Sequence, residues 1–564
     1  MKWRSSLVAL CVACGGVQRV APVEPTPRLS ELPIPGDPAF VTTARDVIAI
    51  AIANDPSVAA SAGLFDDATG VPSFSPAAIS ERTARLDRDL AALRAMPWRT
   101  WPIDQQIDFR WVFANAETAQ RQLVVERVFE HRPAAWLEPL ANQLIAFASY
   151  VPGDPRPRQI WAKVPALVDD MHTVATAVTS RDRETARKLI TALVAMAKVD
   201  GSAEASAAIG SLERYDRELA ALHPTREMTV VGADNYAWRL AHAELLDQSP
   251  AQLLATARSE LARVAIERGA LKSQLPDPPA PTAAQRERAT DLTRDSLLEM
   301  YDAIEAELRA ATIKAGFVTI PASVGPIHAR ETPDAMVPLG GDGGSMNPPP
   351  PYIASNVGAW NVEHFHAGWD DNQRLEKIIG ADGWKTNGFG PYAAHEGFPG
   401  HHLQLAIARL NPDPIRRILV DGMQNEGWGL YAEEELWRHG GLGDAPATKD
   451  AVLRSYQFRI MRVIYDVNIE TGVWTLQQAA DFQQQTPPGK GEINEDLLRA
   501  IQWPTQLVHY FAGKQQILAL RAEYQKKLGA AYTDRAFHDA FLAEGSIPVP
   551  LIRAKLLGTP VPEL

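Results

Sequence analysis

The chain has 564 residues, with 56 Lys and Arg against 68 Asp and Glu, which gives a formal net charge of −12. This acidic balance argues against a nucleic-acid partner, because phosphate contacts require basic patches. The length is sufficient for one large core or for two lobes. Beyond the N-terminus, no segment is apolar over the roughly 20 residues that a membrane crossing requires.

The N-terminus has the pattern of an export signal. Lys2 and Arg4 form a short positive region, and residues 6–13 form a brief apolar run. That run is much shorter than the roughly 20 residues needed to cross a bilayer. The pattern therefore predicts a signal peptide over residues 1–13 that does not belong to the fold.

Both cysteines, Cys11 and Cys14, lie in this region, so we expect neither a disulfide framework nor a cysteine metal site in the folded domain. Residues 12–15, Val-Ala-Cys-Gly, resemble a bacterial lipobox, although Cys11 stands where leucine is usual. We therefore expect lipidation of Cys14 and a bacterial cell-envelope location, facing the periplasm or the surface. Secretion with cleavage elsewhere is the alternative. Residues 14–38, which are rich in proline, would then form a tether.

Helical periodicity dominates the rest of the chain. Apolar residues recur at three- and four-residue spacing, and Ala and Leu are frequent in these stretches. The stretches cover residues 37–54, 80–96, 103–131, 159–178, 184–198, 201–222, 250–271, 283–313, 449–471 and 503–528. Strands are predicted only over 228–231 and 317–320. We therefore predict a mainly α-helical domain over residues 39–564, as one body or as two helical lobes around a deep cleft, with minor β-structure.

Two breaks interrupt the helical pattern. Residues 274–281 are rich in proline, and residues 331–352 contain the glycine-rich run 340–344 and the four prolines 348–351. The glycine run leads into neither a Gly-Lys-Ser/Thr sequence nor a helix, so it is not a phosphate-binding loop. We predict that this long loop forms a cleft wall or lid. A boundary between lobes would fall near 275–350.

Residues 395–404, His-Glu-Gly-Phe-Pro-Gly-His-His-Leu-Gln, and the downstream Glu426 contain the side chains of a hydrolytic zinc site. Zinc accepts imidazole nitrogen and carboxylate oxygen, and a catalytic site keeps one position open for water. Because zinc makes that water a nucleophile near neutral pH, one further carboxylate beside it completes the set. The sequence therefore indicates a metal-dependent hydrolase.

The spacing of the histidines excludes a site on one unbroken helix. In the H-E-x-x-H motif the two histidines are four residues apart and share a helix face. Here His401 and His402 follow His395 by six and seven positions. The sixth position lies on the opposite face, and the seventh lies about 10.5 Å farther along the helix axis. The intervening Gly-Phe-Pro-Gly, residues 397–400, can loop out and restore the one-turn relation.

Together with Glu-Gly-Trp-x-Leu-Tyr at residues 426–431, this motif resembles the signature of a bacterial family catalogued as domain of unknown function 885. That family is similar to the gluzincin zinc metallopeptidases, whose third zinc ligand is a glutamate on a later helix. The resemblance extends over most of residues 40–560 and includes a C-terminal block at 502–552. Where the family tends to read Asp-Thr-Gly-x-His, this chain has Glu470 in place of the histidine. A residue that would bind substrate or stabilise the transition state is thereby replaced.

The resemblance implies roles for individual residues. His395, His401 and Glu426 would be the zinc ligands, and Glu396 would be the general base. His401 is preferred to His402 because family members often carry an aromatic residue at the latter position. By analogy with gluzincins, the strand predicted at 317–320 would lie beside the substrate and pair with its backbone.

Several further side chains are candidates for the site. Tyr510, in the C-terminal block, is the candidate donor to the oxyanion, and a core tyrosine is the alternative. Arg459 and Arg462 would bind a substrate carboxylate or serve as ion-pair partners within the fold. His402 and Gln404 are expected to support the ligands or to contact the substrate.

Other polar residues near the motif have two interpretations. Residues 426–439 are predicted to form an amphipathic helix that presents Glu426 to the first helix. On it, Glu433 to Glu435 would form a solvated face or would support the ligands. His364 and His366 are expected at the rim of the site or on the ordinary surface.

These observations predict a Zn2+-dependent peptidase in which zinc-bound water attacks a peptide carbonyl and Glu396 transfers the proton to the leaving amine. A deep cleft would favour short peptides, an inference that rests on analogy within the fold class. The alternatives are an inactive binding lipoprotein that retains the zinc site, and a metallohydrolase of esters or non-peptide amides. The retained Glu396 argues against the first, because a structural zinc site has no need of a general base.

Overall fold

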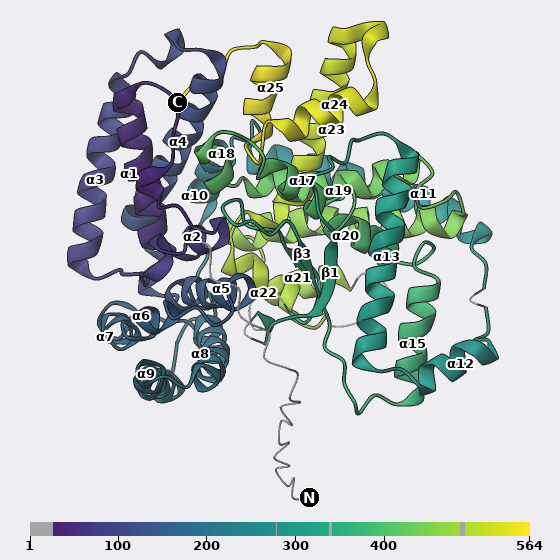
Figure 1. Ribbon diagram of the computed structural model, residues 1–564, viewed down its shortest axis with the longest axis horizontal. Helices are drawn as coiled ribbons and strands as arrows, with labels where there is room; N and C mark the ends of the chain where they lie inside the picture. Colours follow the sequence, from purple (N-terminus) through teal and green to yellow (C-terminus); the bar gives the residue numbers. More distant parts are fainter. Residues whose placement is uncertain (1–25, 278, 335, 338–340, 485–490) are drawn as a thin grey trace, which may run out of the picture.

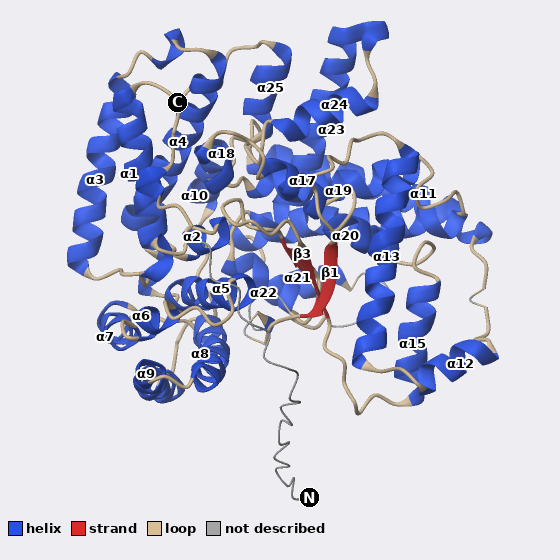
Figure 2. Ribbon diagram, in the orientation of Figure 1, coloured by secondary structure: helices blue, strands red, loops and turns tan. Residues whose placement is uncertain are grey.

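The computed structural model describes residues 26–277, 279–334, 336–337, 341–484 and 491–564. The predicted signal peptide and Cys14 lie outside these ranges. Within them the protein is mainly helical, as predicted, with only one small sheet (Figure 2). No helix among the described residues has the length and apolar character of a membrane span.

The N-terminal half of the chain is built from helices joined by short loops. These are α1 (Pro38–Asn54), α2 (Ser57–Ala62), α3 (Pro76–Ala95), α4 (Ile103–Arg121), α5 (Ala134–Tyr150), α6 (Pro157–Trp161), α7 (Val164–Val174), α8 (Ser180–Asp200), α9 (Ala203–Ala221), α10 (Ala233–Trp238), α11 (Pro250–Leu271), α12 (Ala283–Thr290) and α13 (Arg294–Ala315). Helix α11 has the predicted bounds because Ser249 caps its first turn and Pro250 is its first residue.

The C-terminal half supplies the helices around the candidate site. These are α15 (Asp371–Asp382), α16 (Phe389–Glu396), α17 (His401–Ala408), α18 (Pro414–Ile418), α19 (Gly422–Arg438), α20 (Pro446–Glu470), α21 (Leu476–Gln483), α22 (Glu495–Gln502), α23 (His509–Leu528), α24 (Asp534–Ala543) and α25 (Val549–Leu557). Figure 1 shows α17, α19 and α20 near the centre, with α1, α3 and α4 on one side and α12, α13 and α15 on the other.

Three of the predicted helices were wrong in extent. The helix predicted over 103–131 continues as α-helix only to Arg121, and a π-helical turn after it ends at the left-handed Arg127. The single helix predicted over 283–313 is divided into α12 and α13, because Thr293 caps the N-terminus of α13 through Ser296 N–H. The helix predicted over 159–178 is likewise divided into α6 and α7.

The strands predicted at 228–231 and 317–320 are not strands. Val231 N–H donates to the Glu470 carboxylate at 3.0 Å, and Thr319 N–H donates to Asp539 at 2.8 Å. Side-chain carboxylates, not a neighbouring strand, therefore accept the hydrogen bonds of these backbone N–H groups. An apolar run forms a strand only where a second strand lies beside it to pair with its backbone. The short apolar run at Phe317 packs as a loop instead, with its carbonyl accepting from His538 Nδ1.

The sheet forms elsewhere, around the long loop. Strands β1 (Ile327–Glu331), β2 (Ser345–Asn347) and β3 (Gly358–Val362) have the order β1-β3-β2. Strand β1 is parallel to β3, and β2 is antiparallel to it. Strand β2, which arises within the predicted loop 331–352, is therefore an edge strand.

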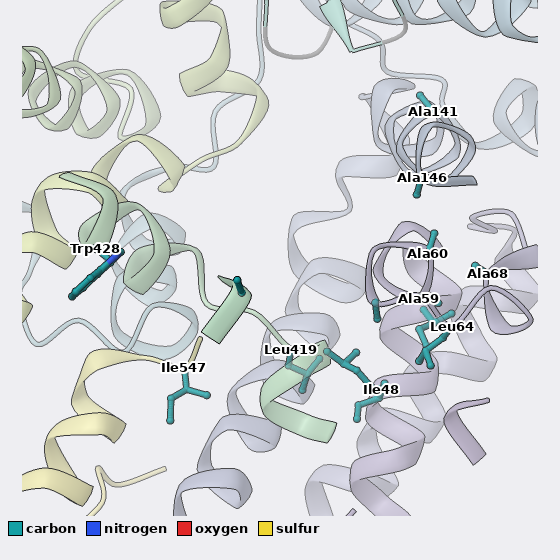
Figure 3. Packing of buried hydrophobic residues seen from close by; sticks show 14 of the residues in the cluster. Ile48, Ala59, Ala60, Leu64, Ala68, Ala141, Ala146, Leu419, Trp428 and Ile547 are labelled. Carbon is teal, nitrogen blue, oxygen red and sulfur yellow. The ribbon is translucent and has the colours of Figure 1, made fainter. Parts of the chain in front are cut away.

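One main core connects distant parts of the chain. It contains residues from Leu29 to Val561, so the lobe boundary predicted near 275–350 does not divide it. Figure 3 shows members from the N-terminal helices, such as Ile48 and Ala60, and from the C-terminal half, such as Trp428 and Ile547. A smaller core lies between α11, α20 and α23.

The C-terminal part of the tether predicted over 14–38, from residue 26 onward, includes residues that belong to the folded body. Leu29, Leu32 and Ile34 are buried in the main core, and Leu29 N–H donates to Asp67 at 2.6 Å. These apolar residues recur within the proline-rich segment and bury against the body, so the folded part begins before residue 39.

Candidate metal centre

The histidine motif is divided between two helices. Helix α16 ends at Glu396 and α17 begins at His401, and residues 397–400 form the turn between them. This is the interruption that the glycines and proline predicted. The turn brings the ring centroids of His395 and His401 to 4.5 Å, with the ring planes nearly perpendicular.

Helix α19 brings Glu426 to these two rings. Glu426 Oε2 lies 3.3 Å from His395 Nε2 and 3.2 Å from His401 Nε2. One ligand atom from each of the three residues lies within 4.8 Å of the other two. Two imidazole nitrogens and one carboxylate oxygen are a donor set that suits zinc. The predicted ligands therefore converge, and their donor atoms fit a metal ion.

The other ring nitrogen of His395, Nδ1, forms a hydrogen bond with a buried glutamate on the side away from Glu426. His395 Nδ1 lies 2.8 Å from Glu433 Oε1, and Ser455 Oγ donates to Glu433 Oε2 at 2.6 Å. Because the buried carboxylate accepts from Nδ1–H, the neutral form of His395 has its lone pair on Nε2, the nitrogen that faces Glu426 and would bind a metal. Of the two interpretations for Glu433, support of a ligand is the one the geometry favours.

The neighbours of Glu433 on α19 do not reach the centre. Glu434 pairs with Lys514, and Glu435 accepts from Arg521 at 2.8 Å. A second group of Glu435, His439 and Asp534 has metal-ligand spacing. Arg521 also donates to Asp534 at 2.6 Å, so a guanidinium already neutralises that group.

The electrostatics of the centre follow from burial and close pairing. Burial disfavours charge on His395, but the contacts with Glu426 and Glu433 outweigh it and raise the pKa of His395 to about 10. Burial likewise opposes the charge on Glu426, yet both histidines hold its pKa well below the ordinary value. Burial raises the pKa of Glu396. A metal ion would compete with protons for these donors.

The structure separates His402 from His401. His402 is fully buried, its Nε2 lies 3.0 Å from the carbonyl oxygen of Gly325, and burial lowers its pKa to about 4. It therefore packs against the strand region and does not face the metal centre. Gln404, from the same helix, donates to Asn425 Oδ1 at 2.7 Å and thereby supports the residue before Glu426.

A cavity of about 460 Å³ opens beside the three ligands. Glu396, His401, Glu426 and Tyr510 line it, together with Asn142, Thr332, Met336, Gly341, Gly343, Gly344, Ser345, Met346, Leu405, Gly422, Asn425, Arg499, Trp503, Gln506 and His509. The segment predicted as a cleft wall, 331–352, contributes several of these residues, including the start of β2. That prediction is confirmed for its described residues.

Tyr510 lies against the metal centre. Its ring stacks on that of His395 with centroids 5.9 Å apart, and its hydroxyl accepts from Arg499 Nη2 at 3.1 Å. Helix α23 carries Tyr510 close to α19 because the two helices cross at Gly427 and Gly513. A Cβ on Gly427 would lie 2.5 Å from the backbone of Gly513.

The two arginines predicted as carboxylate ligands are used within the fold. Arg462 donates to Asp496 at 2.6 Å and lies 4.8 Å from the Tyr510 ring centroid. Arg459 donates to Ser455 at 3.1 Å. Neither is among the described residues that line the cavity. Arg462 is therefore an ion-pair partner within the fold. Arg459 also makes its contact within the fold, but that contact is a hydrogen bond to a serine.

Sequence reasoning missed two cationic residues of the cavity, Arg499 and His509. Helix α22, which carries Arg499, is only one short amphipathic segment, and nothing in its sequence marks that arginine. His509 Nε2 lies 2.9 Å from Glu244 Oε2, and although burial opposes its charge, Glu244 raises the pKa of His509. Glu244 lies in a part of the chain that the motif does not indicate.

The remaining candidates lie away from the ligands. His364 Nδ1 is 2.8 Å from Asp342, and its Nε2 is 3.0 Å from Asp334. His366 lies edge-on to Trp369. Glu470, which replaces the family histidine, is fully buried at the end of α20 and is absent from the described lining of the cavity.

Comparisons with known proteins agree with this fold. A lipoprotein candidate of unknown function from Shewanella oneidensis has a solved structure with a TM-score of 0.72 at 19% identity, covering 92% of this chain and 99% of that chain. A lipoprotein candidate from Colwellia psychrerythraea gives 0.68 at 15% identity, with coverage of 92% and 99%. These identities establish a shared fold alone.

More distant comparisons add little. Metallocarboxypeptidase 1 of Trypanosoma cruzi gives a TM-score of only 0.38 at 12% identity, covering 93% of this chain and 97% of that chain, which does not establish a shared fold. No curated protein matches the chain.

The family model described as "Bacterial protein of unknown function (DUF885)" matches residues 158–556, well over half of the sequence. The chain therefore belongs to this family, as the motif predicted.

Proposed function

We propose that the protein is a zinc-dependent hydrolase that cleaves peptide bonds of short peptides. The observation that carries the proposal is the convergence of His395, His401 and Glu426 beside a cavity that His401, Glu426 and Glu396 line. Ligation alone would need no second carboxylate beside these three residues. A buried acid beside an open ligand set is what hydrolysis requires.

The donor atoms support zinc as the metal. A zinc ion held by His395, His401 and Glu426 would supply a Lewis acid and a water nucleophile near neutral pH. Glu433 fixes the His395 tautomer, and Gln506 donates to the other Glu426 oxygen at 3.3 Å. These contacts orient the ligands before the metal binds.

Glu396 and Tyr510 have separate tasks in the proposed reaction. Glu396 takes a proton from the attacking water and passes it to the leaving amine, so that one water is consumed as the C–N bond breaks and a C–O bond forms. Because the Tyr510 hydroxyl accepts from Arg499, its own hydrogen is free to donate to the oxyanion. Stacking on His395 fixes the direction of that hydroxyl.

The cavity favours a short, extended substrate. Its volume of about 460 Å³ is within the range of small-ligand pockets and is too small for a folded protein. Strand β2 borders the cavity through Ser345 and Met346 and is an edge strand, so its free side suits pairing with a peptide backbone. A backbone contact of this kind favours peptides over simple esters.

We further propose that Cys14 is lipidated and holds the enzyme at the bacterial cell envelope. The lipobox-like sequence at residues 12–15 supports this, and both solved relatives are described as lipoprotein candidates. The lipid would be the membrane contact.

The test compares the purified full chain with its Glu396→Gln variant. We expect about one zinc per chain in both, and cleavage of a mixed peptide library by the wild type with a loss of about 100-fold or more in the variant. Metal content is measured by elemental analysis and cleavage by mass spectrometry. If both proteins contain zinc but neither cleaves the library, the inactive binding protein is favoured. If the folded protein binds no zinc when zinc is supplied, the proposal is refuted.

A further inference from the structure

Arg499 is a cation in the wall of the candidate active site, and no described acidic residue forms an ion pair with it. It lines the cavity together with Glu396 and two of the proposed ligands, His401 and Glu426. Its Nη2 donates to the Tyr510 hydroxyl at 3.1 Å, and its buried Nε has no hydrogen-bond partner. Arginine is always charged and has five donors in a planar fork. Most of these donors are therefore available to an anion in the cavity.

The other basic side chains among the described residues of the cavity wall already lie beside carboxylates. His401 faces Glu426 at 3.2 Å, and His509 lies 2.9 Å from Glu244. The nearby Arg462, outside the cavity, pairs with Asp496. No carboxylate in the described part of the chain forms an ion pair with Arg499. A half-buried guanidinium is well suited to a carboxylate from outside the protein, which it can bind through two parallel hydrogen bonds.

We infer that Arg499 binds the C-terminal carboxylate of the peptide substrate, so that the enzyme removes residues from the C-terminus. The inference rests on the proposed function and adds its substrate class. Tyr510 sets the distance, because its hydroxyl, the proposed donor to the oxyanion, lies 3.1 Å from Arg499 Nη2. One residue of extended chain spans about 3.5 Å. A carboxylate bound to Arg499 would therefore lie one or two residues beyond the bond whose oxyanion Tyr510 stabilises.

The test uses three N-acetylated peptides of one sequence that differ at the C-terminus. The first is a free acid ending in Ala, the second is its C-terminal amide, and the third is an amide ending in Glu. We expect zinc-loaded wild-type enzyme to cleave the free acid about 10- to 100-fold faster, by kcat/KM, than the Ala amide. Mass spectrometry should show first products that lack one or two C-terminal residues.

Substitution of Arg499 tests the residue itself. In Arg499→Gln the ratio of kcat/KM for the free acid to kcat/KM for the Ala amide should fall about 10- to 100-fold, because any effect transmitted through Tyr510 acts on both substrates equally. Arg499→Lys should recover part of this ratio, because it restores the charge without the fork. Binding gives a second readout. In the Glu396→Gln background, calorimetry should show that Arg499→Gln weakens binding of the free acid and leaves binding of the Ala amide unchanged.

Each result distinguishes this inference from the proposed function. Equal cleavage of the free acid and the Ala amide by wild type would overturn the inference and leave the peptidase in place. Rapid cleavage of the Glu amide but not the Ala amide would show that Arg499 binds a side-chain carboxylate, which also overturns it. Cleavage of none of the peptides, nor of the mixed library, would overturn the proposed function itself.

Discussion

His395 uses both of its ring nitrogens, and this explains why a buried glutamate lies behind the candidate metal centre. Nε2 faces Glu426, and Nδ1 lies 2.8 Å from Glu433. Glu433 is itself held by Ser455 and is almost fully buried. A carboxylate in this position orients the imidazole and makes it a better ligand.

We predict that Glu433→Ala weakens zinc binding by about 10- to 100-fold, because His395 loses the group that fixes its tautomer. Glu433→Gln keeps an acceptor for Nδ1–H and should lose less. The measurement is competition with a chelator of known affinity, with circular dichroism to verify folding. Unchanged zinc affinity in a folded Glu433→Ala variant would show that the glutamate does not support the ligand.

At the scale of elements, α19 forms one side of the centre. It carries Glu426 and Glu433, and between them Gly429 leaves space for the ring of His395. A Cβ on Gly429 would lie 2.6 Å from His395 Cε1 and 2.8 Å from Nε2. The absence of a side chain thus determines how closely α16 and α19 approach.

The variant Gly429→Ala should therefore displace His395 and reduce both zinc affinity and activity by at least about 10-fold. Alanine favours a helix over glycine by up to about 1 kcal/mol, so helix propensity acts in the opposite direction. The matched control is Gly210→Ala in α9, where a Cβ would have no neighbour within 4 Å. It should stabilise the protein slightly in thermal unfolding and leave zinc binding unchanged. Equal zinc affinity in both variants would exclude this role for Gly429.

At the scale of the whole molecule, buried carboxyl groups connect α20 to α10 and to the segment before it. Glu470 accepts from Val231 N–H at 3.0 Å, and Asp466 accepts from the Tyr236 hydroxyl at 2.5 Å. Burial, with repulsion from Asp466, raises the pKa of Glu470 from 4.5 to about 8. The folded protein therefore holds a proton that the unfolded chain releases between these two pH values.

This difference makes folding stability dependent on pH. Below pH 4.5, Glu470 is protonated in both states and its contribution is fully present, and it is lost as the pH rises toward 8. Glu470→Gln removes the titration, so its unfolding free energy relative to wild type should increase across this window by an amount on the order of a few kcal/mol. Urea unfolding at pH 5, 6.5 and 8 measures the change. Parallel pH profiles for the two proteins would contradict the assigned ionisation.

The sequence by itself determined the features that depend on local spacing. Periodicity located most of the long helices, and His395, Glu396 and the Gly-Phe-Pro-Gly segment marked the candidate metal centre and the helix break within it. These features follow from residues a few positions apart, whose relation is set by helix geometry and by the dihedral freedom of glycine and proline.

Only the tertiary structure decided the contacts between distant segments. His402 is buried against the Gly325 carbonyl, so only His401 faces the candidate metal centre. Glu433 contacts His395 from another helix. Arg499 lies at the cavity because α22 packs beside α20, while Arg462 is taken by Asp496. The sheet also required strands that meet across the long loop. Such pairings depend on packing between elements far apart in the chain, and no local pattern specifies which partner each side chain meets.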